Sequence, residues 1–290
     1  MRRRRRGAGL LTALVVLAVL VVSTAAFVTW LRSLDDSAPR PDRCAAAVDG
    51  TSWYLDPVQA DHAALIALTA VRRGLPARAA TIGLASALQE SGLRNLPYGD
   101  RDSLGLFQQR PSQGWGTEEQ VMDPVYSTNT FYDVLVTVDG YQDLPITEAA
   151  QRVQRSAFPD AYAQHEGRSR AWASALAGYS PTALTCRLGP AQPVPAEAVL
   201  ERVDRDLGAA ATATAEGVAV DATSLAGGAG EPARLGWAVA HWAVALAGPL
   251  GLAEVRVADH VWQRGPDVWE RDAQPTPLPP GSVLLVLSTG

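Results

Sequence analysis

The N-terminal stretch is the sequence feature that most limits the cellular compartment in which this chain can fold. Five arginines, Arg2 to Arg6, precede a run from Gly7 to Leu31 that contains no charged residue. A membrane-spanning helix needs about 20 apolar residues. Because basic residues stay on the cytoplasmic side, the sequence predicts a basic tail at 1–6, a transmembrane anchor at 7–31 and an extracytoplasmic remainder. A cleaved signal peptide is the alternative, and it exports residues 32–290 equally.

Export makes the two cysteines of the chain informative. Cys44 and Cys186 are separated by about 140 residues, and an oxidising compartment allows such a pair to form a disulfide. The sequence therefore predicts this disulfide, with two separate thiols as the alternative. Two cysteines are too few for a four-thiolate zinc site.

The charge of the chain limits its partners. Its 25 basic residues are all arginine, and they face 30 acidic residues, for a net charge of -5. Because five arginines precede the apolar run, the exported part is more acidic still. An acidic body argues against nucleic acid as a partner. The hydrophobic content of 47% is enough to build a core and excludes wholesale disorder.

Signals for helix starts and helix ends are frequent in the first half of the exported part. Asp56-Pro57 with Gln59 predicts an N-capped helix with a capping box, and Asp123-Pro124 repeats the cap-plus-proline signal. Gly92 is placed to end a further helix. The sequence predicts a linker at 32–52, a mainly α domain at 53–186 and a second linker at 187–198.

Residues 199–290 have a different character. A helical pattern over 196–207 and a strongly apolar helix over 235–246 alternate with short apolar strands at 218–220, 254–257 and 283–287. The predicted fold is thus a mainly α domain plus a small C-terminal α/β module, after an N-terminal transmembrane helix.

One motif carries chemistry. Glu90 and Ser91 end a predicted helix, and after a polar loop the chain continues Gly105-Leu106-Phe107-Gln108. Over about residues 60–180 this pattern resembles the lysozyme-like, soluble lytic transglycosylase family, in a membrane-anchored actinobacterial subgroup. The family has methionine where this chain has Phe107. Downstream, Gln154 stands in place of the family's asparagine, and Tyr162 matches a later tyrosine.

The resemblance implies a lysozyme-like domain that cleaves the N-acetylmuramic acid–N-acetylglucosamine β-1,4 bond of peptidoglycan, without a cofactor or metal. Glu90 would act first as acid and then as base, and the N-acetyl group of the substrate would be the nucleophile. The resemblance also suggests substrate-binding side chains, with the alternatives that Ser91 caps the helix, Gln108 holds the loop and Tyr162 only packs. These residues are Ser91, Ser103, Gln108, Gln154 and Tyr162.

The chemistry of Glu90 also follows from its position. An acid catalyst must still hold its proton near neutral pH. The negative end of the helix dipole and apolar neighbours such as Leu93 both disfavour the carboxylate, so they raise its pKa. If the reaction is hydrolytic, Asp100 and Asp102 are the nearest candidates for a base. The rival hypothesis is an inactive peptidoglycan-binding or scaffold protein.

The C-terminal module weakly resembles a module of actinobacterial peptidoglycan hydrolases related to metal-dependent peptidases. Asp221 could supply the aspartate ligand of such a site, but the closing strand at 282–289 has no histidine. His241 and His260 do not form a recognisable metal pair. The sequence therefore favours a metal-free module for binding or packing.

Overall fold

The computed structural model describes residues 20–25, 27–28, 41–155, 159–228, 231–266, 268–272 and 276–289. It divides into two compact units, Met1–Pro41 and Asp42–Gly290. Residues 20–25 and 27–28 of the first unit are helical. Most of the predicted anchor at 7–31 lies outside the described residues, and no helix in the described part combines the length and apolarity needed to cross a membrane.

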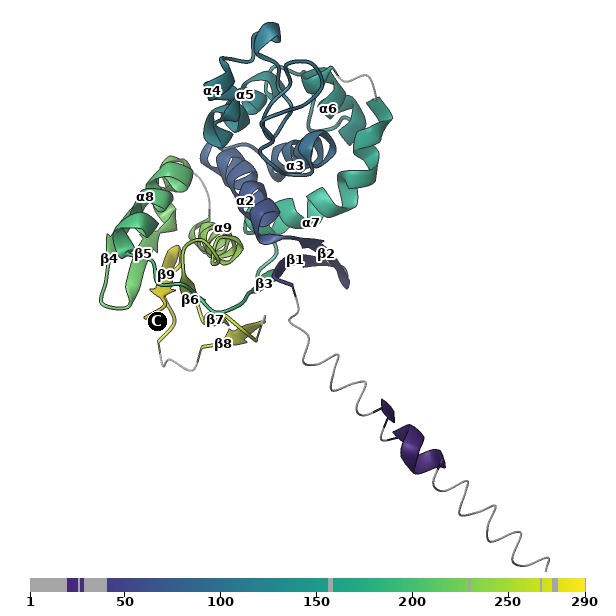
Figure 1. The fold of residues 1–290 in the computed structure, drawn as a ribbon. Helices are drawn as coiled ribbons and strands as arrows, with labels where there is room; N and C mark the ends of the chain where they lie inside the picture. Colours follow the sequence, from purple (N-terminus) through teal and green to yellow (C-terminus); the bar gives the residue numbers. More distant parts are fainter. Residues whose placement is uncertain are drawn as a thin grey trace, which may run out of the picture. The chain divides into compact units, whose positions relative to one another are not determined.

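The second unit contains helices from both predicted parts (Figure 1). Their bounds are α2 Pro57–Arg72, α3 Ala77–Ser91, α4 Glu118–Met122, α5 Pro124–Leu135, α6 Ile146–Gln154, α7 Glu166–Leu176, α8 Ala196–Leu207 and α9 Pro232–Ala245. The strands are β1 Arg43–Val48, β2 Thr51–Leu55, β3 Leu184–Arg187, β4 Ala210–Ala213, β5 Gly217–Asp221, β6 Leu252–Val257, β7 His260–Gln263, β8 Trp269–Arg271 and β9 Ser282–Leu287.

Helices α2 and α5 begin at the predicted residues, and local hydrogen bonds cap their first turns. The Asp56 carboxylate accepts from the Gln59 amide at 2.9 Å, and the Gln59 side chain accepts from the Asp56 amide at 3.0 Å. This reciprocal pair is the predicted capping box of α2. Asp123 caps α5 in a simpler way, by accepting from the Val125 amide at 2.8 Å. Helix α3 ends at Gly92, whose φ of 63° is left-handed.

A three-stranded antiparallel sheet, in the order β2-β1-β3, packs beside α7 and α2. Its strands β1 and β3 place Cys44 directly opposite Cys186, and the two are joined by a disulfide. Both cysteines are fully buried. The predicted disulfide is therefore confirmed, and it ties the start of the helical part to its end.

A six-stranded antiparallel sheet, in the order β4-β5-β9-β6-β7-β8, forms the C-terminal part. Helix α9 lies between this sheet and helices α2 and α7 (Figure 1). Every residue of this helix from Leu235 to Ala245 is buried. A helix that is apolar on all sides can be stable in water only in such a position. The sheet and the helical part therefore share one core.

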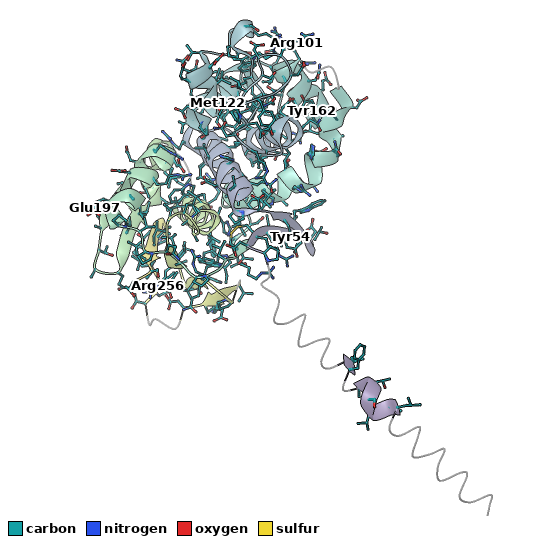
Figure 2. The ribbon with its side chains drawn as sticks, in the orientation of Figure 1. Tyr54, Arg101, Met122, Tyr162, Glu197 and Arg256 are labelled. Carbon is teal, nitrogen blue, oxygen red and sulfur yellow. A yellow bond between two sulfur atoms is a disulfide. The ribbon has the colours of Figure 1, made fainter. Side chains whose placement is uncertain are left out.

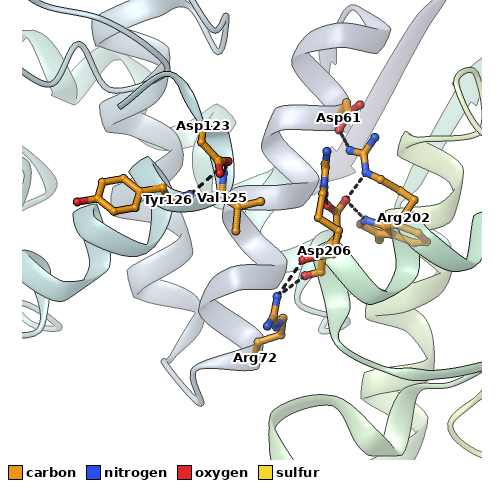
Figure 3. Close-up of polar contacts among 9 residues, drawn as sticks. Asp61, Arg72, Asp123, Val125, Tyr126, Arg202 and Asp206 are labelled. Carbon is orange, nitrogen blue, oxygen red and sulfur yellow. Dashed lines mark hydrogen bonds and ion pairs between the residues drawn. The ribbon is translucent and has the colours of Figure 1, made fainter. Parts of the chain in front are cut away.

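Polar contacts reinforce this shared core between α2 and α8 (Figure 3). Arg202 donates to Asp61 on α2 and to Asp206 on its own helix, the latter at 2.7 Å. The fully buried Asp206 also accepts from the Trp242 indole at 3.0 Å. Because a buried carboxylate needs partners for its oxygens, this cluster forms only when the two parts are docked.

The predicted fold class is wrong. The helical part is completed by a three-stranded antiparallel sheet, and the C-terminal part has a six-stranded antiparallel sheet where a small α/β module is predicted. The described residues also include no helix suited to a transmembrane anchor. For two of the missed strands the physical reason is composition. The segments at 43–48 and 210–213 are alanine-rich, which favours helix locally, and only pairing with distant strands makes them extended.

Candidate active site

Glu90 is the penultimate residue of α3, and the turn behind it is held from α2. After Gly92 the chain remains left-handed at Leu93, with a φ of 60°. The Gln59 side chain donates to the Gly92 carbonyl at 2.9 Å, and His62 Nδ1 donates to the Leu93 carbonyl at 2.8 Å. These bonds satisfy carbonyl groups that a helix end leaves free. The C-terminal end of α3, and with it Glu90, is thereby fixed against α2.

The carboxyl group of Glu90 meets two predicted site residues. Tyr162, labelled in Figure 2, lies in the 3-10 segment Pro159–His165. Its hydroxyl donates to Glu90 Oε1 at 2.6 Å. Desolvation by burial is the largest influence and raises the pKa of Glu90, while hydrogen bonds from Tyr162 and Gln154 oppose it. The net direction is upward, as an acid catalyst requires.

Glu90 lines a cavity of 510 Å³. Three of the predicted substrate-binding residues line it too: Ser103, Gln108 and Gln154. The remaining lining residues are Asp100, Arg101, Gln109, Arg110, Gln113, Trp115 and Arg155. Tyr162 is fully buried behind Glu90 and reaches the site through its hydroxyl. The fold thus brings residues that lie up to 65 positions apart in the sequence together at one cavity.

Ser91 does not line the cavity. Its hydroxyl lies 2.6 Å from the Leu106 carbonyl and 3.1 Å from the Ala87 carbonyl, and it accepts from the Arg94 amide at 3.2 Å. These bonds are those of a helix C-terminal cap that also ties α3 to the following loop. The geometry favours the capping alternative for Ser91.

Two glutamine side chains at the cavity are anchored to backbone. Gln108 donates to the carbonyls of Tyr98 at 3.3 Å and Gly105 at 3.2 Å, and its own backbone is left-handed with a φ of 47°. Gln154 donates to the Phe107 carbonyl at 2.8 Å. Both amides therefore hold the loop between α3 and α4 while still lining the cavity.

Phe107 stands where the motif that the sequence resembles has methionine. Its ring stacks on Phe131 of α5 with centroids 4.6 Å apart, and it is buried. The side chain therefore anchors the loop in the core and contributes no cavity surface. Replacing a flexible methionine by a rigid ring is a packing change at this position.

The two aspartates considered as bases differ in position. Asp102 accepts from the Ser112 amide at 2.8 Å and from Arg110 at 2.7 Å. Hydrogen bonds from Ser112, and after them the one from Arg110, hold the pKa of Asp102 well below its usual range. Because the Asp102 carboxylate is ionised and already hydrogen-bonded within the loop, it is a poor proton acceptor. Asp100 lines the cavity, with its side chain 93% exposed.

Sequence reasoning missed the arginines of the cavity. Arg101, Arg110 and Arg155 all line it beside Glu90. Arginines are scattered along this whole chain, so neither their spacing nor their neighbours single these three out. Their shared position depends on how the loop folds between α3 and α4 and on where α6 ends.

Nothing in the described part of the chain groups three or more histidine, cysteine or acidic residues in a way that could hold a metal ion. His241 is fully buried, and its Nδ1 donates to the Ala175 carbonyl at 2.7 Å. Burial lowers the pKa of His241 to about 4, so it is neutral at pH 7. It therefore acts in packing between α9 and α7.

Comparison with models of known protein families finds no match, and comparison with curated proteins finds none either.

Proposed function

We propose that this protein cleaves the glycan strands of peptidoglycan at the N-acetylmuramic acid–N-acetylglucosamine bond, with Glu90 as the acid and base. One observation carries the proposal: a half-buried carboxyl group with a raised pKa lines a cavity of 510 Å³ and accepts a hydrogen bond from Tyr162. The motif at Glu90-Ser91 and Gly105-Leu106-Phe107-Gln108 supports the same chemistry.

The first half of the reaction uses the proton of Glu90. The acid donates this proton to the glycosidic oxygen as the bond from C1 of the muramyl residue breaks. The acetamido carbonyl oxygen of the same sugar forms a bond to C1 and gives a cyclic oxazolinium ion. Glu90 is then a carboxylate, and the Tyr162 hydroxyl at 2.6 Å stabilises that charge.

The second half returns the proton. The carboxylate of Glu90 accepts the proton of the 6-hydroxyl group, whose oxygen attacks C1. The bond between C1 and the acetamido oxygen breaks, and the product has a 1,6-anhydro ring. The acid form of Glu90 is regenerated, so the cycle requires one carboxyl group and no cofactor. The engagement of Asp102 with Arg110 and Ser112 supports this single-carboxylate reaction.

An extracytoplasmic location is part of the proposal, because peptidoglycan lies outside the cytoplasm. The buried disulfide between Cys44 and Cys186 supports it. Disulfides of this kind persist mainly in oxidising compartments. The basic segment and apolar run at the N-terminus fit the same location.

Mass spectrometry of digested peptidoglycan tests the proposal. The full-length chain is incubated with purified peptidoglycan beside Glu90→Gln and a control, Glu148→Gln. Glu148 is a carboxylate on α6 that pairs with Arg152 at the surface. We expect anhydro-muropeptides from the wild type and the control, and a loss of about 10²- to 10⁴-fold for Glu90→Gln.

Other outcomes change the proposal in defined ways. Reducing-end products that depend on Glu90 would replace the transglycosylase reaction by hydrolysis. Absence of cleavage by a folded wild type that still binds peptidoglycan would favour the inactive binding or scaffold protein.

A further inference from the structure

The cavity at Glu90 differs in charge from the rest of the chain. The protein has a net charge of -5, yet three arginines line this cavity against two acidic residues, Glu90 and Asp100. The raised pKa of Glu90 favours its neutral form more than in an ordinary glutamate. Because Asp102 offsets the charge of Arg110 and Asp100 lies near Arg101, the charge of Arg155 is the one that can attract an anionic ligand at this cavity.

The three arginines are not equally available. Arg110 is engaged with Asp102 at 2.7 Å and stays with the loop. Arg101 lies 3.9 Å from Asp100, and both side chains are largely exposed. Within the described part of the chain, the Arg155 side chain makes no ion pair or hydrogen bond. Arg155 is thus the cation of this cavity that is ready to receive an anion.

Arg155 also lies where two cavities meet. A second cavity of 480 Å³ adjoins the one at Glu90, and both are lined by Gln113, Trp115, Gln154 and Arg155. The second cavity continues between α5 and α6, along Thr130, Val134 and Val153. Arg155 follows directly after α6 in a left-handed conformation, with a φ of 50°. A ligand that places a sugar at Glu90 can therefore extend a branch past Arg155.

We propose that Arg155 binds a carboxylate carried by the branch of the muramyl residue, so that the site selects carboxylated glycan strands over neutral ones. The proposal rests on the proposed function, because it assigns the glycan to the Glu90 cavity. A guanidinium group pairs well with a carboxylate through charge-assisted hydrogen bonds. Trp115, in the wall shared by both cavities, offers an aromatic surface to the same branch.

The carboxylate has two chemical sources. A strand stripped of peptides still carries the carboxylate of the lactyl ether, close to the sugar. A strand with peptide stems has lost that carboxylate to an amide bond and carries its own farther out. Both present the same chemistry to Arg155, and the choice of ligand separates them.

Binding is measured by calorimetry in a Glu90→Gln background, so that no turnover occurs. Three glycan oligomers of equal length serve as ligands: peptide-bearing strands, the same strands with every carboxyl group converted to an amide, and peptide-free strands. Arg155→Gln is compared with Arg152→Gln, a neighbouring arginine on α6 that pairs with Glu148 and lines neither cavity. Arg155→Asn is a second neutral variant, because asparagine tolerates left-handed backbone well.

We expect at least one carboxylated ligand to bind about tenfold more tightly than the amidated strands, and Arg155→Gln and Arg155→Asn to remove that difference. The difference also shrinks as salt is added. Arg152→Gln retains it. Preference for peptide-free strands assigns the lactyl carboxylate, and preference for peptide-bearing strands assigns the stem.

Two results separate failure of this inference from failure of the proposed function. Tight binding of all three ligands without a charge preference, or equal weakening of all three by both Arg155 variants, overturns the role of Arg155 alone. No binding of any strand by the folded protein overturns the proposed function as well.

Discussion

Glu90 and Tyr162 lie 72 positions apart and meet through one hydrogen bond. Two opposing influences act on the carboxyl group there. Burial favours the protonated form, which the proposed acid step would use, and the phenol hydroxyl favours the carboxylate, which the proposed base step would use. A group that must alternate between both forms needs this balance. Removing either influence should therefore change its protonation in a predictable direction.

Glu90→Gln should make the protein more stable near neutral pH. A carboxyl group whose folded pKa lies above its ordinary value of 4.5 binds its proton more tightly in the folded state. Stability therefore falls as pH rises through the folded pKa, and the uncharged glutamine escapes that loss. Denaturant unfolding at several pH values measures it. The excess stability of the variant should decline toward lower pH, and a variant less stable than wild type at pH 7 contradicts the prediction.

Tyr162→Phe should move the pH profile of cleavage. The variant loses a hydrogen bond that lowers the pKa of Glu90, so the pKa rises and the acid form persists to higher pH. The alkaline limb of the pH profile of kcat/KM should shift to higher pH. Tyr179→Phe, a change at an exposed tyrosine outside the cavity, is the control and should leave the limb in place. A shift of the alkaline limb to lower pH would show that the phenol does not lower the pKa of Glu90.

At the scale of elements, α3 carries the site because it packs closely on two neighbours. Gly83 lies in the middle of this helix, and a Cβ added there would be 2.8 Å from Tyr132 Oη and 3.1 Å from Ile66 Cγ2. Tyr132 is fixed in place, because its hydroxyl donates to the Ile66 carbonyl at 2.9 Å. A missing side chain thus allows α3 to approach α2 and α5.

Gly83→Ala should therefore destabilise the protein, although alanine favours helix by about 1 kcal/mol. Overpacking typically costs about 1–3 kcal/mol, so we expect a net loss of about 1 kcal/mol in the free energy of unfolding. Gly236→Ala on α9 is the matched control, because its nearest contacts would be 3.4 Å away. Chemical denaturation compares the two. Equal gains in both variants would mean that α3 has room to adjust.

The helices and strands differ in how far along the sequence the interactions that form them extend. The start of α2 and its capping box follow from Asp56, Pro57 and Gln59, all within one turn. The strands do not follow from local sequence in this way. Strand β9 lies between β5 and β6 although it comes last in the chain, and β1 pairs with β3 from the other end of the helical part. Such pairings depend on segments that no short window of sequence contains.

At the scale of the whole molecule, the six-stranded sheet is part of the body that carries Glu90. Residues 42–290 form one compact unit, with α9 buried between the sheet and helix α2. Helix α2 also holds the turn behind Glu90 through Gln59 and His62. The C-terminal part therefore supports the helix that fixes the site.

Arg202→Met should lower the stability of this whole unit by about 3 kcal/mol, because removing one partner of a buried ion pair leaves the other uncompensated. Arg202 bridges Asp61 and the buried Asp206. Arg205→Met is the control: Arg205 also contacts Asp206, but its side chain is 50% exposed, so we expect a loss below about 1 kcal/mol.

Circular dichroism and tryptophan fluorescence should report the same single transition for both variants. Separate transitions would show that the helical part and the sheet unfold independently. Equal losses for Arg202→Met and Arg205→Met would show that the bridge to Asp61 adds nothing.

Features whose causes are local or chemical could be predicted from the amino-acid sequence. These are the capped helix starts, the glutamate at the end of α3 and the availability of two cysteines for a disulfide. The tertiary structure alone decided the two antiparallel sheets, the meeting of Tyr162 with Glu90 and the cluster of arginines at the cavity. The reason is that capping acts within one helical turn, whereas strand pairing, desolvation and the field in a cavity depend on residues that only the complete fold brings together.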